Sequence, residues 1–462
     1  MKKIVLTFAF VLLVGIAFAQ GIVGDWAGVL AVNGAKLRII FHITKTGDGY
    51  KSTMDSPDQG AKGLPVGATT FADNKITINA SQYGINYTGT YLPDSNKING
   101  SFPQGGKIVP LNFTWSKYTI AARSQDPKDF PYKQEEVAFD NPKGGDRLAG
   151  TLTMPADGKA SKIVILITGS GPENRDEEVF NHRPFLVISD WLTRHGIAVL
   201  RYDDRGVAKS TGNYNTATTA DFADDAEAAV NYIQSRSDLK NLSIGLMGHS
   251  EGGTIAPMVA SRNKSVKFLV LLAGPGVPNE QLMLKQTADI ARLQGASDEG
   301  IKLSSASNKK VYDLIIQNPT MTAAQLKPLL DTLMYRDFRS YPGGGLPDKR
   351  IAEIVQQNAT LLAPWYRYFI AMNPADYLTK IQCPVLALDG TLDMQVNAEA
   401  NLAGIKASLE KAGNKNFEVV ALPGLNHLFQ KATTGAVAEY EQIDETIDPV
   451  VLDKVTAWIN KL

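Results

Sequence analysis

One serine in this chain has the surroundings of an enzyme nucleophile. The segment 248–252 reads Gly-His-Ser-Glu-Gly and is the only G-x-S-x-G in the sequence. It follows the apolar run LSIGLM, which predicts a buried strand, and precedes TIAPMVA, which is compatible with a helix. On so sharp a strand-to-helix turn the hydroxyl is held exposed, and side chains at the glycine positions would collide with neighbouring backbone. We predict that Ser250 is a nucleophile. With 40 glycines in the chain, the alternative is an ordinary surface turn.

A serine hydroxyl attacks a carbonyl efficiently only when a neighbouring base removes its proton. The chain has five histidines, and only His427 follows Ser250. In enzymes with this type of turn the acid and then the histidine follow the serine along the chain. His427 lies in the loop after a strand-like run, Phe417–Leu422, and is predicted to be the base. His249 is adjacent to the serine, so its ring is expected to point elsewhere and to pack or line the pocket.

The acid that orients the histidine is sought in the same way. The segment CPVLALDGTLDMQV contains an apolar strand, 384–388, followed by a turn. Asp393 lies in the loop beyond the strand, where catalytic groups of a parallel sheet converge. Asp389 ends the strand itself and is expected to bond the turn backbone. We predict Asp393 as the acid, with Asp389 as the alternative.

Two backbone N–H groups are needed to hold the negative oxygen that forms during attack on a carbonyl. One is predicted to come from Glu251, directly after the serine. The other is predicted to come from Ser170, in the loop GSGPENRDEE that follows the apolar strand 162–168. Gly171 is the alternative donor, whereas Pro172 has no N–H. The same glycines are also compatible with a simple tight turn.

Several of these motifs occur together and in order. ITGSGPENRDE, NHRPFLVISDWLTRHGIAVLRYDDRG, GHSEGG, GTLDMQV and LNHLF succeed one another between about residues 135 and 462. Together they resemble bacterial serine hydrolases of the α/β-hydrolase superfamily, described as esterases or as serine-aminopeptidase-like hydrolases. Similar proteins often have glycine at the position of Ala208. Arg175 and Asp176 match the group's pattern and are expected to pair with each other or with the loop at residues 204–205.

The elements that must position these residues can be read from the apolar pattern. From Val137 onward, apolar strands alternate with helical segments, which predicts a doubly wound, mostly parallel sheet over residues 137–462. Acidic residues early in the helix 219–235, including Asp225, are expected on a solvated face. Helical spacing interrupts the strand pattern over about 276–381 and predicts a helical cap above the catalytic strand ends. In that cap, Trp365 and Phe369 are expected to bind the acyl group of the substrate. The alternative is that they form the cap's own core.

The N-terminal part of the chain has a different pattern. Over residues 20–118, short runs rich in isoleucine, threonine and aromatic residues alternate with Gly, Asp, Asn and Pro turns, which predicts a small antiparallel barrel or sandwich. A polar, proline-containing linker is expected at 119–136. This accessory domain is expected to pack on the hydrolase, and a sharper hypothesis is that its loop 53–60 reaches the rim of the active site.

The first residues and the composition of the chain indicate its cellular location and the kinds of partner that can be expected. Residues 1–19 carry Lys2 and Lys3, an apolar run and a small-residue cleavage site, which predicts a signal peptide and a periplasmic or secreted enzyme. With 47 basic and 47 acidic residues, the charge gives no reason to expect nucleic acid. Cys383 is the only cysteine, so it forms no intramolecular disulfide. We expect no membrane anchor, no metal and no cofactor.

These residues together predict a secreted serine hydrolase that cleaves carboxylic esters with a Ser250–His427–Asp393 triad and an acyl-enzyme intermediate. A small-molecule ester is the expected substrate. The first alternative is an aminopeptidase-like or amide-cleaving enzyme, which would need a carboxylate to hold a substrate ammonium. The second is a binding protein built on a hydrolase scaffold, which the complete set of catalytic residues disfavours.

Overall fold

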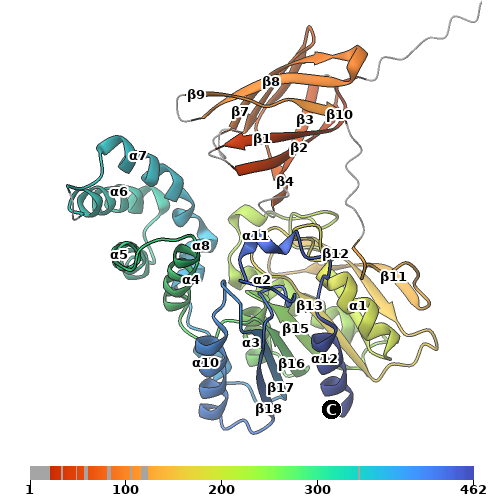
Figure 1. The fold of residues 1–462 in the computed structure, drawn as a ribbon. Helices are drawn as coiled ribbons and strands as arrows, with labels where there is room; N and C mark the ends of the chain where they lie inside the picture. The colour runs from red at the N-terminus through yellow and green to blue at the C-terminus, as the bar shows by residue number, and fades with distance from the viewer. Residues whose placement is uncertain are drawn as a thin grey trace, which may run out of the picture. The chain divides into compact units, whose positions relative to one another are not determined.

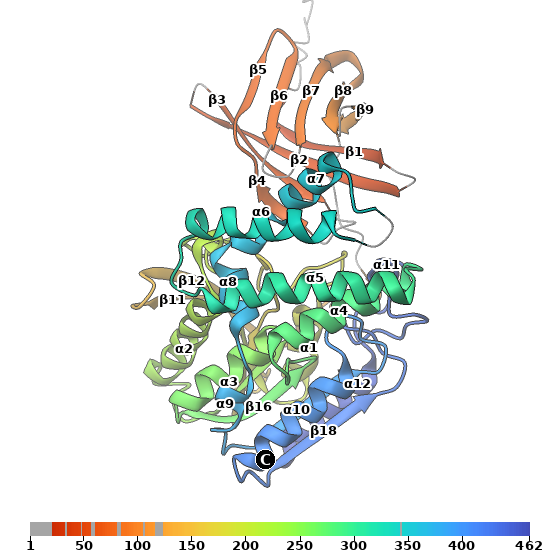
Figure 2. The ribbon, with the colours of Figure 1, turned by 90° about the vertical axis from the view of Figure 1, so that its left-hand side faces the viewer.

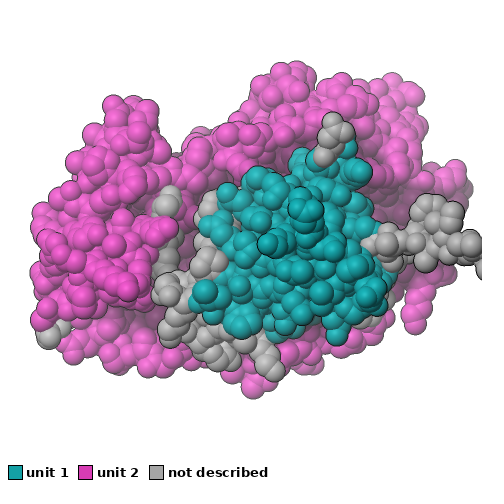
Figure 3. Space-filling model, turned by 90° about the horizontal axis from the view of Figure 1, so that it is seen from above, with its two compact units in different colours: residues 1–120 teal, residues 121–462 magenta. Residues whose placement is uncertain are grey.

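The computed structural model describes residues 21–462, apart from short segments at 33–34, 48, 57–60, 81–84, 105–106, 116–122 and 342–343. The chain divides into two compact units, residues 1–120 and 121–462, which are coloured separately in Figure 3. The expected signal peptide lies outside the described residues, and so does part of the loop 53–60.

The first unit is a closed antiparallel β-barrel. Its strands in ring order are β1 (Gly24–Val32), β2 (Ala35–Thr46), β3 (Gly49–Ser56), β5 (Thr69–Ala72), β6 (Lys75–Ala80), β7 (Ile85–Leu92), β8 (Lys97–Gln104) and β10 (Phe113–Trp115). The ring closes because β10 pairs with both β1 and β8. Two short strands, β4 (Ala61–Pro65) and β9 (Lys107–Pro110), pair antiparallel with β3 and β8 respectively (Figure 1). This closure confirms a barrel rather than a sandwich.

Alternating side chains fill the interior of the barrel. Ile39, Phe41 and Ile43 of β2 are buried, because every second residue of a strand points to the same side. Phe41 packs against Tyr87 and Phe113, with ring centroids 5.9 and 5.2 Å away. The middle of this unit is therefore a packed aromatic and aliphatic core.

The second unit is built on one mixed sheet. Its strand order is β11 (Lys133–Asn141), β12 (Asp146–Met154), β14 (Ala198–Tyr202), β13 (Lys162–Ile167), β15 (Ser243–His249), β16 (Val266–Leu272), β17 (Val385–Gly390) and β18 (Phe417–Leu422). The first two strands are antiparallel to their neighbours, and all later pairs are parallel. The mostly parallel sheet is confirmed. β11 begins within the segment that was expected to be linker.

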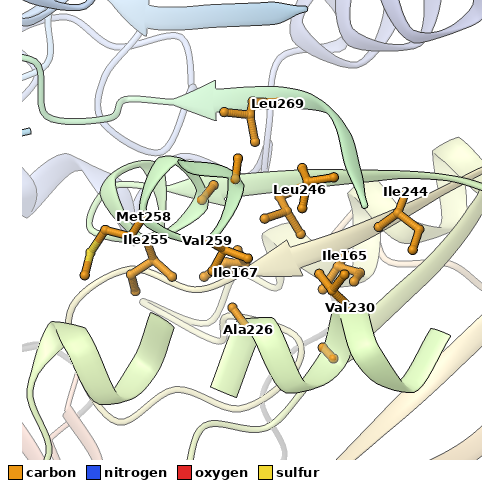
Figure 4. Packing of buried hydrophobic residues seen from close by; sticks show 14 of the residues in the cluster. Ile165, Ile167, Ala226, Val230, Ile244, Leu246, Ile255, Met258, Val259 and Leu269 are labelled. Carbon is orange, nitrogen blue, oxygen red and sulfur yellow. The ribbon is translucent and has the colours of Figure 1, made fainter. Parts of the chain in front are cut away.

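The strand sequences account for the layers on both sides of this sheet. In β13, Ile163, Ile165 and Ile167 join one buried cluster and Val164 and Leu166 join another, so both faces of the strand are apolar. The first face is covered by α2 (Thr219–Ser235), α3 (Gly252–Arg262) and α10 (Ala398–Lys411). The second is covered by α1 (Pro184–Arg194) and α12 (Pro449–Lys461). Figure 4 shows the packing of β13 and β15 against α2 and α3.

A helical cap lies in the chain between β16 and β17, as predicted. Its helices, seen in Figure 2, are α4 (Asn279–Leu293), α5 (Asp298–Gln317), α6 (Ala323–Arg339), α7 (Asp348–Gln357) and α8 (Pro364–Ala371). They share a small core that includes Ile315, Leu330 and Ile370. The sequence reasoning missed α6, which contains Pro328. Its signal was the capping box formed by Thr322 and the third helical residue, Gln325.

One expectation about α2 is wrong. Asp225 does not lie on a solvated face, because only 2% of it is exposed. Its carboxylate accepts hydrogen bonds from Asn141 Nδ2 at 2.7 Å and from Arg205 Nε at 2.7 Å. Burial raises the pKa of Asp225, while the Arg205 contact acts in the opposite direction. The residue ties α2 to β11 and to the loop after β14.

Candidate active site

Ser250 lies on a strained turn at the carboxyl end of β15. Its φ is 54°, a left-handed conformation that non-glycine residues rarely adopt. The turn is possible because the residues two positions before and two positions after Ser250 are glycines. A Cβ atom on Gly248 would lie 1.9 Å from the carbonyl oxygen of Gly252, and a Cβ on Gly252 would lie 2.2 Å from the carbonyl oxygen of Ile167. Backbone packing therefore requires glycine on both sides of the serine.

The predicted base and acid lie in direct contact. Nδ1 of His427 is 2.6 Å from Oδ2 of Asp393, and both residues are only 4% exposed. The other carboxylate oxygen of Asp393 accepts the backbone N–H groups of Gln395 at 2.7 Å and Val396 at 2.8 Å. With its Nδ1–H donated to this fixed carboxylate, the imidazole has Nε2 available as a base. The structure thus brings together two of the three predicted triad residues by a hydrogen bond.

The alternative acid, Asp389, occupies a different position. It is completely buried at the end of β17, and its Oδ1 accepts the backbone N–H of Gly390 at 2.8 Å. Burial and the adjacent carboxylate of Asp393 raise the pKa of Asp389 well above its ordinary value. Oδ2 has no hydrogen-bond donor among the described residues. Burial and the nearby Asp393 carboxylate both favour the protonated form of Asp389.

His249 serves the site in a way that the sequence did not indicate. Its Nδ1 is 2.9 Å from Oε1 of Glu177 and its Nε2 is 2.9 Å from the backbone oxygen of His427. Both partners are acceptors, so both ring nitrogens carry a proton. Burial alone would lower the pKa of His249, but Glu177 and the carbonyl outweigh it and raise that pKa. His249 therefore acts as a buried cation that holds the loop of His427.

Glu177 also holds the loop after β13. Its Oε1 accepts the backbone N–H of Gly169 at 3.0 Å. A Cβ on Gly169 would lie 3.3 Å from Cβ of Ser250, so this loop passes directly against Ser250. Sequence reasoning missed Glu177, although it lies in the acidic end of the GSGPENRDEE segment.

The backbone N–H groups of this loop are used unequally. The N–H of Gly169 is donated to Glu177, and that of Gly171 is donated to the hydroxyl of Tyr214 at 2.9 Å. In the part of the chain that the structure describes, the N–H groups of Ser170 and Glu251 have no recorded protein acceptor. These are the two groups predicted to bind the oxyanion. The alternative donor, Gly171, is already engaged.

Arg175 and Asp176 brace the same loop, but with other partners than expected. They do not pair with each other. Arg175 bonds Asp203 through Nε at 3.0 Å and through a terminal nitrogen at 2.8 Å. Asp176 pairs with Arg201 of β14. The interaction thus involves the end of β14, just before the expected residues 204–205.

The two predicted substrate-binding aromatic residues lie where the cap meets the strand–turn–helix at residues 248–252, which is called the elbow. Nε1 of Trp365 donates to both carboxylate oxygens of Glu251, at 2.9 and 3.0 Å. Phe369 stacks on Trp365 with ring centroids 5.1 Å apart and is 6% exposed. Trp365 therefore contacts the residue next to Ser250, and Phe369 supports it from within the cap.

The described residues include no group of three or more histidine, cysteine or acidic side chains placed to hold a metal ion. Among the helices described, none is long and apolar enough to cross a membrane. Cys383 is partly buried, and burial raises the pKa of its thiol to about 11. Reactivity of this thiol near neutral pH is thereby suppressed.

Comparison with known proteins supports the same fold. Residues 184–331 match a family model described as serine aminopeptidase, S33. Esterase EstD of Thermotoga maritima is 24% identical over 389 residues, which span 82% of this chain and 81% of that esterase. The uncharacterized protein YfhR of Escherichia coli is 32% identical over 127 residues, or 27% of this chain and 40% of YfhR.

Solved structures with a partial likeness include the Pyrococcus furiosus esterase Pf2001, with a TM-score of 0.43 and 18% identity over 72% of this chain and 93% of that one. The Pseudomonas aeruginosa hypothetical protein PA2218 has a TM-score of 0.47 and 14% identity over 75% of this chain and 98% of the other. The strand order and the elbow, together with the matching sequences, confirm the predicted α/β-hydrolase fold with an all-β domain before it.

Proposed function

We propose that this α/β-hydrolase is a serine enzyme that cleaves carboxylic esters. The observation that carries the proposal is the buried 2.6 Å contact between His427 and Asp393, in the unit whose strained elbow presents Ser250. A buried histidine held by a fixed carboxylate is the arrangement that activates a serine hydroxyl.

The reaction follows from the roles of these atoms. Ser250 Oγ forms a bond to the ester carbonyl carbon while Nε2 of His427 takes its proton. The carbonyl oxygen becomes an anion and is held by the N–H groups of Ser170 and Glu251. Return of the proton from His427 to the alkoxy oxygen releases the alcohol and leaves an acyl-serine. Water then repeats the sequence, with His427 as its base, and releases the carboxylic acid.

Esters are preferred over aminoacyl amides as substrates because of the carboxylates beside the nucleophile. The match of residues 184–331 to a serine aminopeptidase model raises the alternative. Such an enzyme must hold the substrate's ammonium with a carboxylate. Glu177 and Glu251 are already bonded to protein donors, to His249 and to Trp365 among others. Both oxygens of Glu251 already accept hydrogen bonds, and Glu177 already contacts His249 through Oε1, while its Oε2 is buried.

The leader-like sequence at residues 1–19 supports a further part of the proposal, that the enzyme acts in the periplasm or outside the cell. Comparing the mature N-terminus of the exported protein with the predicted cleavage after Ala19 tests this. Accumulation of the uncleaved chain in the cytoplasm would contradict it.

Labelling and turnover test the nucleophile directly. A fluorophosphonate should label the wild type at Ser250, and the wild type should hydrolyse p-nitrophenyl esters faster than aminoacyl anilides. Ser250→Ala should lose labelling and about 10³-fold or more of the ester turnover while its melting temperature is retained. Near-wild-type turnover in Ser250→Ala would overturn the mechanism, and faster cleavage of the anilides would favour the aminopeptidase alternative.

A further inference from the structure

The side chain after the nucleophile joins three separate parts of the hydrolase unit. Glu251 is 1% exposed. Its carboxylate accepts the hydroxyl of Ser170 at 2.8 Å, the hydroxyl of Thr219 at 2.6 Å and the indole N–H of Trp365 at 2.9 and 3.0 Å. These donors belong to the loop after β13, the start of α2 and the cap helix α8. One carboxylate thereby links the loop 169–178 (the oxyanion loop), helix α2 and the cap.

A carboxylate at this position is unfavourable in two respects. Burial opposes its charge and raises the pKa of Glu251, while the three donors favour the charged form. A fixed negative charge beside a developing oxyanion also disfavours the transition state. Elbow geometry requires only glycines on either side of the serine, so a small residue would satisfy the turn. The side chain must therefore contribute through the groups that it holds.

Trp365 is suited to transmit the position of the cap. It lies in the first turn of α8 and stacks on Phe369 with an interplanar angle of 23°. The next residue, Tyr366, faces Tyr312 of α5 with ring centroids 6.4 Å apart. Helix α8 is thus anchored in the cap core through Tyr366 and to the elbow through Trp365. Displacement of the cap would remove the indole donor from Glu251.

Ser170 is placed to receive that change. Its hydroxyl bonds Glu251, while its backbone N–H is one of the two groups left for the oxyanion. The neighbouring glycines are tied elsewhere, to Glu177 and to Tyr214. The hydroxyl bond is therefore the contact that sets how the peptide at Ser170 is turned.

We propose that the Glu251 side chain is a positioning group that couples docking of the cap to assembly of the oxyanion hole. With α8 docked, Trp365 and Ser170 share the carboxylate and the Ser170 N–H faces the reacting oxygen. With α8 displaced, the carboxylate loses its cap donor and the loop loses its alignment. This inference rests on the proposed function for its catalytic consequence, but the coupling itself is a property of the fold.

A double-mutant cycle tests the coupling. Trp365→Phe removes the indole donor but keeps an aromatic ring on Phe369, and Ser170→Ala removes the hydroxyl but keeps the backbone N–H. Each should lower kcat for p-nitrophenyl butyrate about ten-fold with little change in KM. Both substitutions disrupt the same set of Glu251 contacts, which is called the latch. The fold-loss of kcat in the double variant should therefore be clearly smaller than the product of the two single fold-losses.

Thr219→Val is the matched control. It deletes a donor to the same carboxylate, but one that leads to α2 rather than to the cap or the oxyanion loop. Its kcat should fall much less than that of Trp365→Phe. An equal fall in this control, or a double variant whose loss equals the product of the single losses, would overturn the coupling.

Hydrogen exchange followed by mass spectrometry gives a readout that does not depend on turnover. Ser170→Ala should speed exchange in α8, and Trp365→Phe should speed exchange in the loop 169–178, whereas Thr219→Val should do neither. Unchanged exchange in both segments would overturn the coupling even if the esterase activity is present. If the wild type hydrolyses no ester and takes up no fluorophosphonate, the proposed function fails, and the exchange result still decides whether the latch exists.

Discussion

At the scale of single residues, the two carboxyl groups near His427 have different roles. Asp393 is held by two backbone N–H groups and contacts the imidazole, while Asp389 is buried behind it with a raised pKa. Two adjacent carboxyl groups in a buried site cannot both ionise easily, so one keeps its proton. The geometry assigns the charge to Asp393, which accepts two backbone N–H groups and contacts the imidazole, whereas Asp389 accepts one backbone N–H.

The first consequence concerns Asp393. Asp393→Asn should reduce kcat by about 10³–10⁴-fold, because an amide at this position no longer fixes the histidine tautomer or stabilises its cation. KM should change little. The measurement is steady-state kinetics on a p-nitrophenyl ester, with the melting temperature as a control for folding.

Asp389→Asn should behave differently. The amide oxygen can still accept the N–H of Gly390, and the amide, like the protonated acid, places no charge beside Asp393. Turnover should therefore stay within about three-fold of the wild type. A collapse of turnover in this variant, with Asp393→Asn nearly unaffected, would reverse the assignment of the acid.

The raised pKa of Asp389 also has a consequence for stability. Above the unfolded pKa of about 3.9 and below the raised folded value, the native state holds a proton that the unfolded chain has lost. The stability from this group is fully present below the unfolded pKa. It is lost as pH rises, by up to about 1.4 kcal/mol per pH unit. Asp389→Asn should remove this slope, so urea unfolding at pH 5 and pH 8 should show a relative gain at pH 8. No difference in slope would contradict the protonated state.

At the scale of elements, the strand–turn–helix that carries Ser250 depends on close approach of backbone segments. The start of α3 lies so close to β13 that a Cβ on Gly252 would meet the carbonyl oxygens of Ile167 at 2.2 Å and Thr168 at 2.6 Å. Backbone atoms of a central strand cannot move aside as a flexible side chain can. The elbow is therefore sensitive to a single methyl group.

Gly252→Ala should destabilise the fold by about 1–3 kcal/mol or more and should impair turnover, because the added methyl overpacks the sheet–helix junction. Gly300→Ala is the control. Its Cβ would meet only the hydroxyl of Ser297 at 3.2 Å, at the exposed first turn of helix α5. That variant should be neutral or more stable by up to about 1 kcal/mol. Similar melting temperatures for the two variants would count against the steric argument.

At the scale of the whole molecule, the chain has separate hydrophobic cores for its two units. The barrel core is built from residues such as Phe41, Tyr87 and Phe113, whereas the hydrolase core lies on both faces of the parallel sheet. Units with their own cores can unfold in separate transitions.

Phe113→Ala should destabilise the barrel by about 3–5 kcal/mol, because the side chain is fully buried against two aromatic rings. Phe268→Ala, in the sheet of the second unit, is the matched change there. Calorimetry should show that each variant lowers a different transition, and loss of ester turnover on heating should follow only the transition that Phe268→Ala lowers. One shared transition that moves in both variants would show that the units unfold together.

Much of this molecule was predictable because it is encoded in contiguous residues. The elbow needs two glycines around a serine, and buried strands need continuous apolar runs. The helix 219–235 was predicted at its observed bounds. The order of strands and helices then predicted a parallel sheet, whose carboxyl ends bring distant loops together. For that reason Asp393 could be chosen as the partner of His427, and the 2.6 Å contact agrees with that choice.

The tertiary structure alone decided which side chains share a contact when their segments are far apart in the chain. Closure of the barrel depends on β10 meeting both β1 and β8. Burial of Asp225 depends on Arg205, and the charge on His249 depends on Glu177. Residues such as Glu251 and Trp365 can lie on a surface or in a core, so their residue types alone do not reveal that they contact each other. Their partners are selected by distances of a few ångströms between packed elements, and local propensity carries no information about those distances.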